Sequence, residues 1–215
     1  MKSVLIIAAS LLLTLRIAAG QALAESDVVA EKVPDAAIIS AVKAVGDLGK
    51  SVVQGRYAFA LERMNPKEKE RLARQLGGLA AVEDQLKGVA AEMLKQGVRI
   101  LSSKPQGKPA AYGVEPVMVT DEVEGKKVSR WLYSQWLVLV PTVTRFEVMH
   151  RVEGQPPKWI QIESISYQVA VSGRDREDWT FIDGASLTAA RLCGLYKTLP
   201  KDIQLPEVKK RQINN

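Results

Sequence analysis

Apolar side chains recur at helical spacing in the first part of the chain that follows Pro34. Steps of three and four separate Ile38, Val42, Val45, Leu48 or Gly49, and Val52. This spacing places the apolar positions on one buried face of a helix. Pro34 and Asp35 are typical residues for its start. Gly46 and Gly49 either weaken this helix or mark a close approach to an element packed on it.

A short apolar segment and two further helices are predicted next. The segment covers residues 57–64, and Asn65 with Pro66 then gives a strong helix start, with Asn as the N-cap and Pro at the first helical position. That helix ends at Gly77. The following one ends at Gly97, which suits a left-handed C-cap. Its buried face is expected at Leu79, Val82, Leu86, Val89 and Met93.

From residue 98 onward the apolar period changes to that of strands. The predicted strands cover residues 98–103, 114–120, 128–140, 142–152, 159–172 and 179–182. Their separators are rich in Gly and Pro, which favour turns. Residues 131–140 are apolar on both parities. This pattern predicts a strand covered on both faces, by helices on one side and by the curl of the sheet on the other.

The apolar parity changes inside the strand predicted at 159–172. Ile160 and Ile162 share one parity, whereas Ile165, Tyr167, Val169 and Val171 share the other. A regular strand cannot move its side chains to the other face within one residue. The sequence therefore predicts a bulge or a sharp bend near Glu163 and Ser164.

Helices followed by long strands predict an α+β fold. Helices from residues 34–96 are expected to pack on a strongly curved, mostly antiparallel sheet from residues 98–183, followed by a short C-terminal helix and an extended tail. The stretches QGRYAFALERMNP, residues 54–66, and DWTFIDG, residues 178–184, resemble the nuclear transport factor 2-like superfamily. The resemblance covers about residues 34–190 and implies the cone-shaped fold of ketosteroid isomerases and polyketide cyclases. Because that superfamily includes enzymes, binding proteins and assembly modules, it does not decide the function.

The first 24 residues differ from the rest in composition. Lys2 precedes an apolar run over residues 4–15, and residues 22–24, Ala-Leu-Ala, fit the small-residue pattern of a cleavage site. These features predict a secretory signal peptide cleaved after Ala24, and hence a periplasmic or secreted protein. A membrane anchor is the alternative, but Arg16 interrupts the apolar run short of the roughly 20 residues that a spanning helix needs. The expected organisation is a linker over residues 25–33, one domain over 34–208 and a frayed polar tail over 209–215.

The charge and the cysteine content limit which partners and which kinds of site are expected. The formal net charge is +6, but the basic clusters lack the interleaved aromatic side chains typical of nucleic-acid binding. Because an exported protein also meets no genomic nucleic acid, no nucleic-acid partner is predicted. The single cysteine, Cys193, excludes an intrachain disulfide and is expected to be a small buried apolar residue. One Cys and one His disfavour a Cys/His metal site. No phosphate loop or dinucleotide motif is present, so no cofactor is predicted.

The candidates for acid–base chemistry are few. Asp183, followed by Gly184 at the end of a predicted strand, is interpreted as a turn residue rather than a catalytic carboxylate. His150 is the only histidine, and any histidine-dependent mechanism must use it. Of the two mid-strand carboxylates, Glu147 is expected to face water, whereas Glu163 lies at the predicted bulge, where side chains are often re-aimed, and is the better catalytic candidate.

Large amphipathic side chains mark a candidate ligand pocket. They are Tyr57, Trp131, Tyr133, Trp136 and Tyr167. Rings of this kind bury much area while their polar ends seek partners, and we expect a narrow cavity that they largely fill. Without a paired acid and base, the favoured function is an exported non-catalytic domain that binds a protein partner or a small hydrophobic ligand. The alternative is an isomerase- or cyclase-like enzyme with a single buried carboxylate, and a homodimer stays open.

Overall fold

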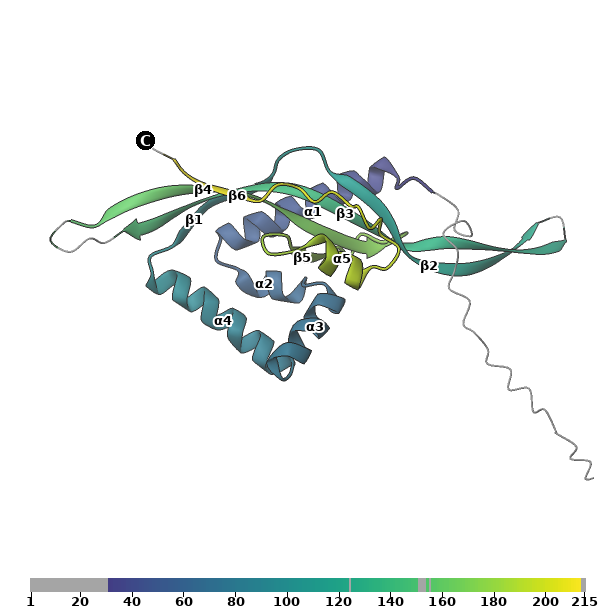
Figure 1. Ribbon diagram of the computed structural model, residues 1–215, viewed down its shortest axis with the longest axis horizontal. Helices are drawn as coiled ribbons and strands as arrows, with labels where there is room; N and C mark the ends of the chain where they lie inside the picture. Colours follow the sequence, from purple (N-terminus) through teal and green to yellow (C-terminus); the bar gives the residue numbers. More distant parts are fainter. Residues whose placement is uncertain (1–30, 124, 151–153, 155, 214–215) are drawn as a thin grey trace, which may run out of the picture.

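The computed structural model describes residues 31–123, 125–150, 154 and 156–213. The predicted signal peptide, its cleavage site and most of the predicted linker lie outside these residues. Figure 1 shows the helices of the N-terminal half beside an extended sheet formed by later parts of the chain. The α+β class predicted from the sequence is confirmed, and the sheet is antiparallel and open rather than closed.

Helix α1, Asp35–Val53, confirms the first helical pattern. Its buried positions include Ala41, Val45 and Leu48. A Cβ atom added at Gly49 would lie 2.4 Å from the carbonyl oxygen of Ser103. Gly49 therefore marks a close approach between the helix and a neighbouring strand, which is one of the two meanings expected for it.

Helices α2, Tyr57–Glu62, α3, Pro66–Leu76, and α4, Leu79–Lys95, follow. The predicted start of α3 is confirmed, since the Asn65 side chain accepts a hydrogen bond from the Lys67 backbone N–H at 3.1 Å. The predicted end is confirmed as well, because Gly77 adopts a left-handed conformation with φ of +87°.

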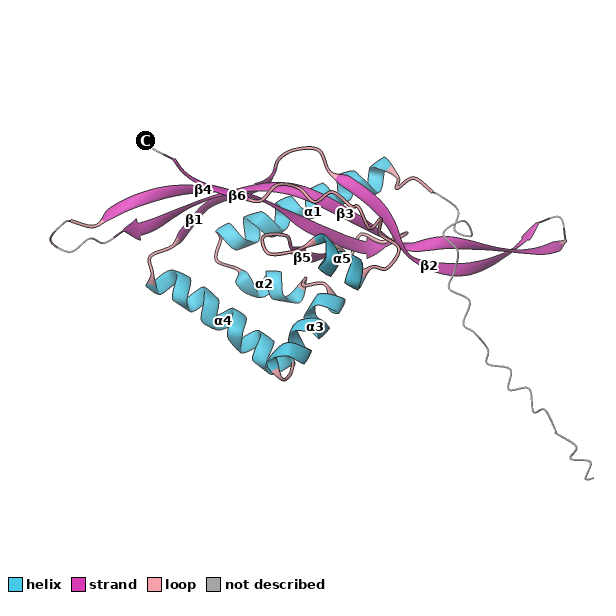
Figure 2. Cartoon of the chain, viewed as in Figure 1, coloured by secondary structure: helices cyan, strands magenta, loops and turns pink. Residues whose placement is uncertain are grey.

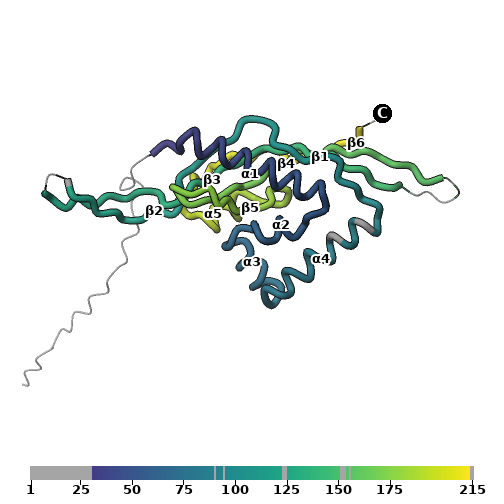
Figure 3. The backbone as a smooth tube through the Cα atoms, turned by 180° about the vertical axis from the view of Figure 1, so that it is seen from behind, coloured from purple at the N-terminus to yellow at the C-terminus, as the bar shows by residue number. Residues whose placement is uncertain are grey.

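The buried face predicted for α4 is only partly correct. Val82 is buried, but Leu79 and Val89 are 52% and 51% exposed. This helix packs chiefly against α3 and lies apart from the sheet, as Figure 3 shows. The apolar side chains of α4 therefore border the space between this helix and the rest of the domain and do not pack into a filled core.

In the described part of the chain, six strands form one sheet around two long central strands. They are β1, Arg99–Pro105, β2, Ala110–Val123, β3, Lys126–His150, β4, Lys158–Gly173, β5, Thr180–Asp183, and β6, Lys209–Ile213. Strand β3 pairs with β1 and β2 on one side and with β4 on the other, and β5 and β6 both pair with β4. Figure 2 shows that the β2–β3 and β3–β4 hairpins extend beyond the helices at the two ends of the sheet.

The prediction of separate strands before and after Pro141 was wrong, because β3 runs through this residue. The pairing of β3 changes here: Ala110 of β2 pairs with Leu139, and Pro105 of β1 pairs with Thr142. The carbonyl of Pro141 accepts a hydrogen bond from Gln106 in the connection between these two strands. The missing N–H of proline thus falls where the neighbouring strand is interrupted, so it removes no ladder hydrogen bond.

The bulge predicted near Glu163 was also wrong. Strand β4 pairs with β3 without a register shift from Gly173 to Lys158, and Glu163 lies opposite Arg145. The apolar residues change parity along β4 because the two faces of the strand pack against different parts of the protein. Tyr167, Val169 and Val171 pack against the C-terminal segment, whereas the even positions 164, 166 and 168 face a cavity.

The centre of the sheet is covered on both faces, as predicted for residues 131–140, although burial is complete only from Trp136 onward. Val138 and Val140 pack with α1 on one face. Leu137 and Leu139 pack on the other face with α5, Ala189–Leu195, and the segment that follows it. The second cover is therefore a C-terminal helix and loop rather than the curl of the sheet. Half-buried Cys193 packs at the margin of this second cluster.

The predicted tail and the end of the predicted linker are both anchored where the structure describes them. Residues 209–213 form the edge strand β6 instead of a frayed tail, although the first four of their side chains are polar. At the other end, Val33 is buried in the α1 cluster and Glu31 is ion-paired with Arg174. Residues 31 and 33 therefore belong to the packed domain rather than to a free linker.

Candidate ligand-binding cavity

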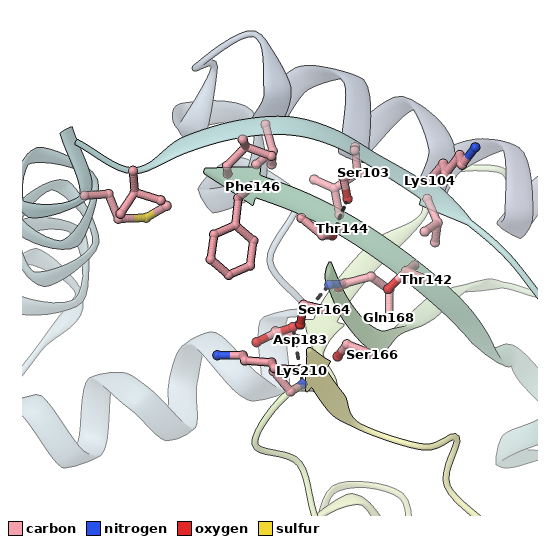
Figure 4. Close-up of a pocket in the computed structure, with 18 residues that line it drawn as sticks. Ser103, Lys104, Thr142, Thr144, Phe146, Ser164, Ser166, Gln168, Asp183 and Lys210 are labelled. Atoms are coloured by element: carbon pink, nitrogen blue, oxygen red, sulfur yellow. Dashed lines mark hydrogen bonds between the residues drawn. The ribbon is translucent and has the colours of Figure 1, made fainter. Parts of the chain in front are cut away.

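A cavity of about 400 Å³ lies between α1 and the face of β3 and β4 that carries their even-numbered residues (Figure 4). One wall is apolar. Leu48 and Val52 of α1 contribute to it, together with Met93 of α4 and with Val98, which follows that helix. The other wall is the sheet itself, which contributes the ring of Phe146 and a group of hydroxyl side chains.

The hydroxyl wall comes from two register pairs of the central strands. Thr142 lies opposite Ser166, and Thr144 lies opposite Ser164. The hydroxyl of Thr144 is hydrogen-bonded to that of Ser103 on β1 at 2.9 Å. The Ser166 hydroxyl, in contrast, is buried and has no hydrogen-bond partner among the residues that the structure describes. A buried polar group of this kind calls for a partner, from water or from a ligand.

Charged side chains lie at the rim of the cavity, namely Lys104, Asp183 and Lys210. Asp183 accepts hydrogen bonds from Gln168 Nε2 at 3.2 Å and from the Ala185 backbone N–H at 3.4 Å. The second bond bridges two residues along the chain, as in an Asx turn. The turn role predicted for Asp183 is therefore seen, while its exposed carboxylate also contributes to the cavity rim.

A second cavity of about 390 Å³ adjoins the first, since Leu48, Val52, Gln168 and Asp183 line both. It extends toward α2, α3 and α4 and toward the start of α5. Its further apolar lining is Ala60, Met64, Leu72, Leu86, Phe181 and Ile182.

An ion-pair cluster forms the polar side of this second cavity. Buried Glu68 accepts two hydrogen bonds of 2.8 Å from Arg71 and a further one from Arg191 of α5. The hydrogen bonds to Glu68 raise the pKa of Arg71. The Nε–H of Arg191 is buried and has no partner among the described residues. Two guanidinium groups thus share one carboxylate, which leaves an excess of positive charge beside the cavity.

Glu163 lies on the opposite face of the sheet and lines neither cavity. The residue is 5% exposed, and its carboxylate accepts hydrogen bonds from Arg211 Nε at 2.9 Å and Arg145 Nε at 3.0 Å. Arg211, and then Arg145, lower the pKa of this carboxyl group through these bonds. A general acid needs the opposite, a raised pKa, so this environment is that of a structural ion pair.

His150 is the exposed last residue of β3, opposite Lys158 in the β3–β4 hairpin. It borders two other hollows, which are formed with β4 and β6. It lines neither of the two adjoining cavities. The structure therefore does not bring the two catalytic candidates, His150 and Glu163, to one site.

The five aromatic candidates do not converge on a pocket, and none of them lines either cavity. Trp136 packs in the α1 cluster and donates to the Arg174 carbonyl at 2.9 Å. Tyr133 is at the margin of that cluster, and Tyr57 and Trp131 are half-buried elsewhere. Tyr167 is buried on the other face of the sheet, where its hydroxyl lies 3.3 Å from the Leu187 carbonyl. Burial raises its pKa to about 12.

Sequence reasoning missed the residues that line the cavities. A usable signal was present: Ser164, Ser166 and Gln168 alternate with Ile165, Tyr167 and Val169. This alternation of polar and apolar residues predicts a strand with one polar face. The Glu68–Arg71–Arg191 cluster had no such signal, because its members lie 123 positions apart in the longest pair.

Within the described part of the chain, no helix is long and apolar enough to cross a membrane. The same residues contain no group of three or more His, Cys, Asp or Glu side chains that could hold a metal ion. Comparison of the chain with protein-family models, with curated proteins and with solved structures finds no match.

Proposed function

We propose that this protein is a non-catalytic binding domain that takes up a small hydrophobic or amphipathic molecule between α1 and the sheet. The observation that carries the proposal is the cavity itself, in which apolar side chains of α1 face the hydroxyl-bearing residues of β3 and β4. Small-molecule sites combine mostly apolar walls with a few polar groups in this way. The volume of about 400 Å³ is within the usual range of such sites, about 300–1,000 Å³.

The side chains around the cavities favour binding over catalysis. Both lining carboxylates are engaged: Asp183 holds a turn and accepts from Gln168, and Glu68 accepts from two arginines. The alternative, an isomerase- or cyclase-like enzyme, relied on Glu163, whose low pKa and position on the other face do not favour it. Both carboxylates are thus already held by protein donors, an arrangement that suits the orientation of a bound ligand.

The binding proposal is tested with N-phenyl-1-naphthylamine, a neutral apolar dye whose fluorescence rises on burial. Val52 lines both cavities, whereas its neighbour Val53 is 36% exposed and lines neither. We expect saturable binding near one dye per chain, weakened at least tenfold by Val52→Trp, which fills the cavity junction. The matched variant Val53→Trp adds the same ring at the surface and should bind like wild type.

Two results contradict the proposal. One is the absence of saturable binding to wild type, and the other is equal binding to the Val52→Trp and Val53→Trp variants. The second outcome would place the dye elsewhere, for example on the apolar residues 4–15, which neither substitution touches. Circular dichroism of both variants checks that each remains folded.

We further propose that the protein is exported and that it is a nuclear transport factor 2-like domain with a cone-shaped interior. Helices that precede an antiparallel sheet, with α1 packed over one of its faces, support this resemblance. Amino-terminal sequencing of protein from the exported fraction tests the first part. A start at Glu25 supports cleavage after Ala24, and a retained Met1 in the membrane fraction contradicts it.

A further inference from the structure

We infer that the ligand is a single-chain amphiphile with an anionic head group, held with its head at Lys210 and its chain along the apolar wall of the two adjoining cavities. The inference rests on the proposed binding function and specifies the ligand class. It is carried by the charges of the lining, by the position of Lys210 and by the shape of the apolar surface.

Positive charge exceeds negative charge around the cavities. The lining cations are Lys104, Lys210, Arg71 and Arg191, and the lining anions are Asp183 and Glu68. Glu68 is shared by two arginines, and Asp183 accepts from uncharged donors. An apolar site lined by excess positive charge concentrates anionic ligands and disfavours cationic ones.

Lys210 is the lining cation best placed for a head group. It lies on β6 opposite Ser164 in the register of β4. In Figure 4 its side chain extends below the ring of Phe146, whereas Lys104 points away from that ring. Its neighbour Lys209 is paired with Glu207 at 3.9 Å, but Lys210 has no carboxylate partner among the described residues.

The hydroxyls next to Lys210 complete a polar end for the site. Ser164 lies opposite Lys210, and Ser166 follows on the same face of β4. Hydroxyl groups donate to an oxyanion, and a neighbouring ammonium strengthens such hydrogen bonds. A carboxylate or phosphate head at this end would lie beside Lys210 and the hydroxyl-bearing residues Ser164 and Ser166.

The apolar surface leads away from this end along a path suited to one chain. Phe146, Leu48 and Val52 line the first cavity, and the last two continue into the second, where Leu86 and Phe181 follow. The two cavities, of about 400 and 390 Å³, adjoin at Leu48 and Val52. An alkyl chain can follow an apolar surface from one cavity into the other, because it bends at each bond.

The experiment measures displacement of N-phenyl-1-naphthylamine by decanoate and by 1-decanol, which share a ten-carbon chain. We expect decanoate to bind more tightly than 1-decanol to wild type. Lys210→Gln should weaken decanoate about three- to fivefold, the effect of one partly exposed charge pair, and leave 1-decanol unchanged. Lys209→Gln removes the same charge one residue away, on the other face of β6, and should change both affinities less than about twofold.

Each other result has a distinct meaning. Equal displacement by decanoate and 1-decanol, unaffected by Lys210→Gln, overturns the anionic head group while the binding function stands. An equal loss of decanoate in Lys209→Gln and Lys210→Gln overturns the assignment of the head to Lys210. Decyl phosphate then distinguishes a phosphate from a carboxylate head, and tighter binding of either one than of 1-decanol supports the inference. Failure of the dye itself to bind overturns the proposed function instead.

Discussion

Glu163 and Arg211 join the C-terminal strand to the centre of the sheet. Arg211 donates through Nε to Glu163 Oε1 at 2.9 Å, while Arg145 donates to Oε2 at 3.0 Å. The three side chains come from neighbouring positions of β3, β4 and β6. The carboxylate of Glu163 thus connects three strands, although Glu163 and Arg211 lie 48 positions apart in the sequence.

We predict that this carboxylate makes stability depend on acidic pH. Because the folded state lowers the pKa of Glu163 from its ordinary value of 4.5, its contribution is fully present above pH 4.5 and is lost as pH falls through the lowered pKa. Urea unfolding of wild type and of Glu163→Gln, at pH 7 and at pH 3, measures the effect. The variant should be less stable at pH 7 and should lose less stability on acidification.

Exposed Glu177 supplies the control for this measurement. Glu177→Gln should follow the wild-type pH dependence. If Glu163→Gln lost as much stability between pH 7 and pH 3 as wild type does, the arginine pair would not control this carboxyl group.

Asn65 is predicted to contribute strongly to the free energy of unfolding. It is buried, caps α3, and donates from Nδ2 to Tyr196 at 3.0 Å and to Thr180 at 3.1 Å. Asn65→Ala should lower the free energy of unfolding by about 2–4 kcal/mol, since a lost cap and an unsatisfied buried group add up. Thr188→Ala removes only the exposed cap of α5 and should cost about 1 kcal/mol. Equal losses would show that the buried bonds contribute nothing.

Two glycines of α1 should respond to alanine in opposite directions. Gly49→Ala would place a Cβ atom 2.4 Å from the Ser103 carbonyl oxygen, and we expect a loss of about 1–3 kcal/mol from overpacking. Gly46→Ala meets only Pro105 at 3.7 Å and should gain about 0.5–1 kcal/mol, because alanine favours a helix over glycine. Thermal unfolding distinguishes them, and stabilisation by both changes would contradict the close approach of α1 and β1.

Two buried tyrosines should make the protein unstable in base. Burial raises the pKa of Tyr167 and of Tyr196 from 10.0 to about 12. Their contribution to stability is full below pH 10 and is lost as pH rises toward about 12, because the unfolded state ionises first. Unfolding free energy measured across this window should fall less steeply in Tyr196→Phe, and less steeply still when Tyr167→Phe is added. Identical slopes in all three proteins would contradict this origin.

Local signals predicted the helices well. The start of α3 at Asn65 and Pro66 and its end at Gly77 depend on hydrogen bonds and backbone angles within a few residues. The close approach at Gly49 was one of two readings, and only the position of Ser103 decides between them. The class of the fold followed from the order of such elements.

Long-range pairing accounts for what the sequence did not predict. Pro141 is tolerated in β3 because its neighbour changes from β2 to β1 at that residue. Residues 209–213 read as a polar tail, yet they pair with β4. Neither pairing can be predicted from the residues that flank these positions in the sequence.

The candidate site was missed for a related reason. The five aromatic residues were grouped by size, but the sheet separates Trp136 from Tyr167 by placing them on opposite faces. Glu163 was selected for a bulge that does not exist. The hydroxyls at Ser164 and Ser166 followed a visible alternation, but polar positions on a strand usually face water, and only α1 turns this face into a cavity wall.

Strand β3 has a consequence for how the chain folds during synthesis. Val45 and Leu48 of α1 leave the ribosome long before Val138 and Val140, the residues of β3 on which they pack. Ribosomes add about 5–20 residues per second, so the apolar face of the helix stays uncovered for several seconds. Because β1, β2 and β4 all pair with β3, no part of the sheet can close earlier, and the high contact order of such a topology slows folding further. The newly made helices are therefore the segment most exposed to aggregation, and to capture by chaperones, before the domain exists.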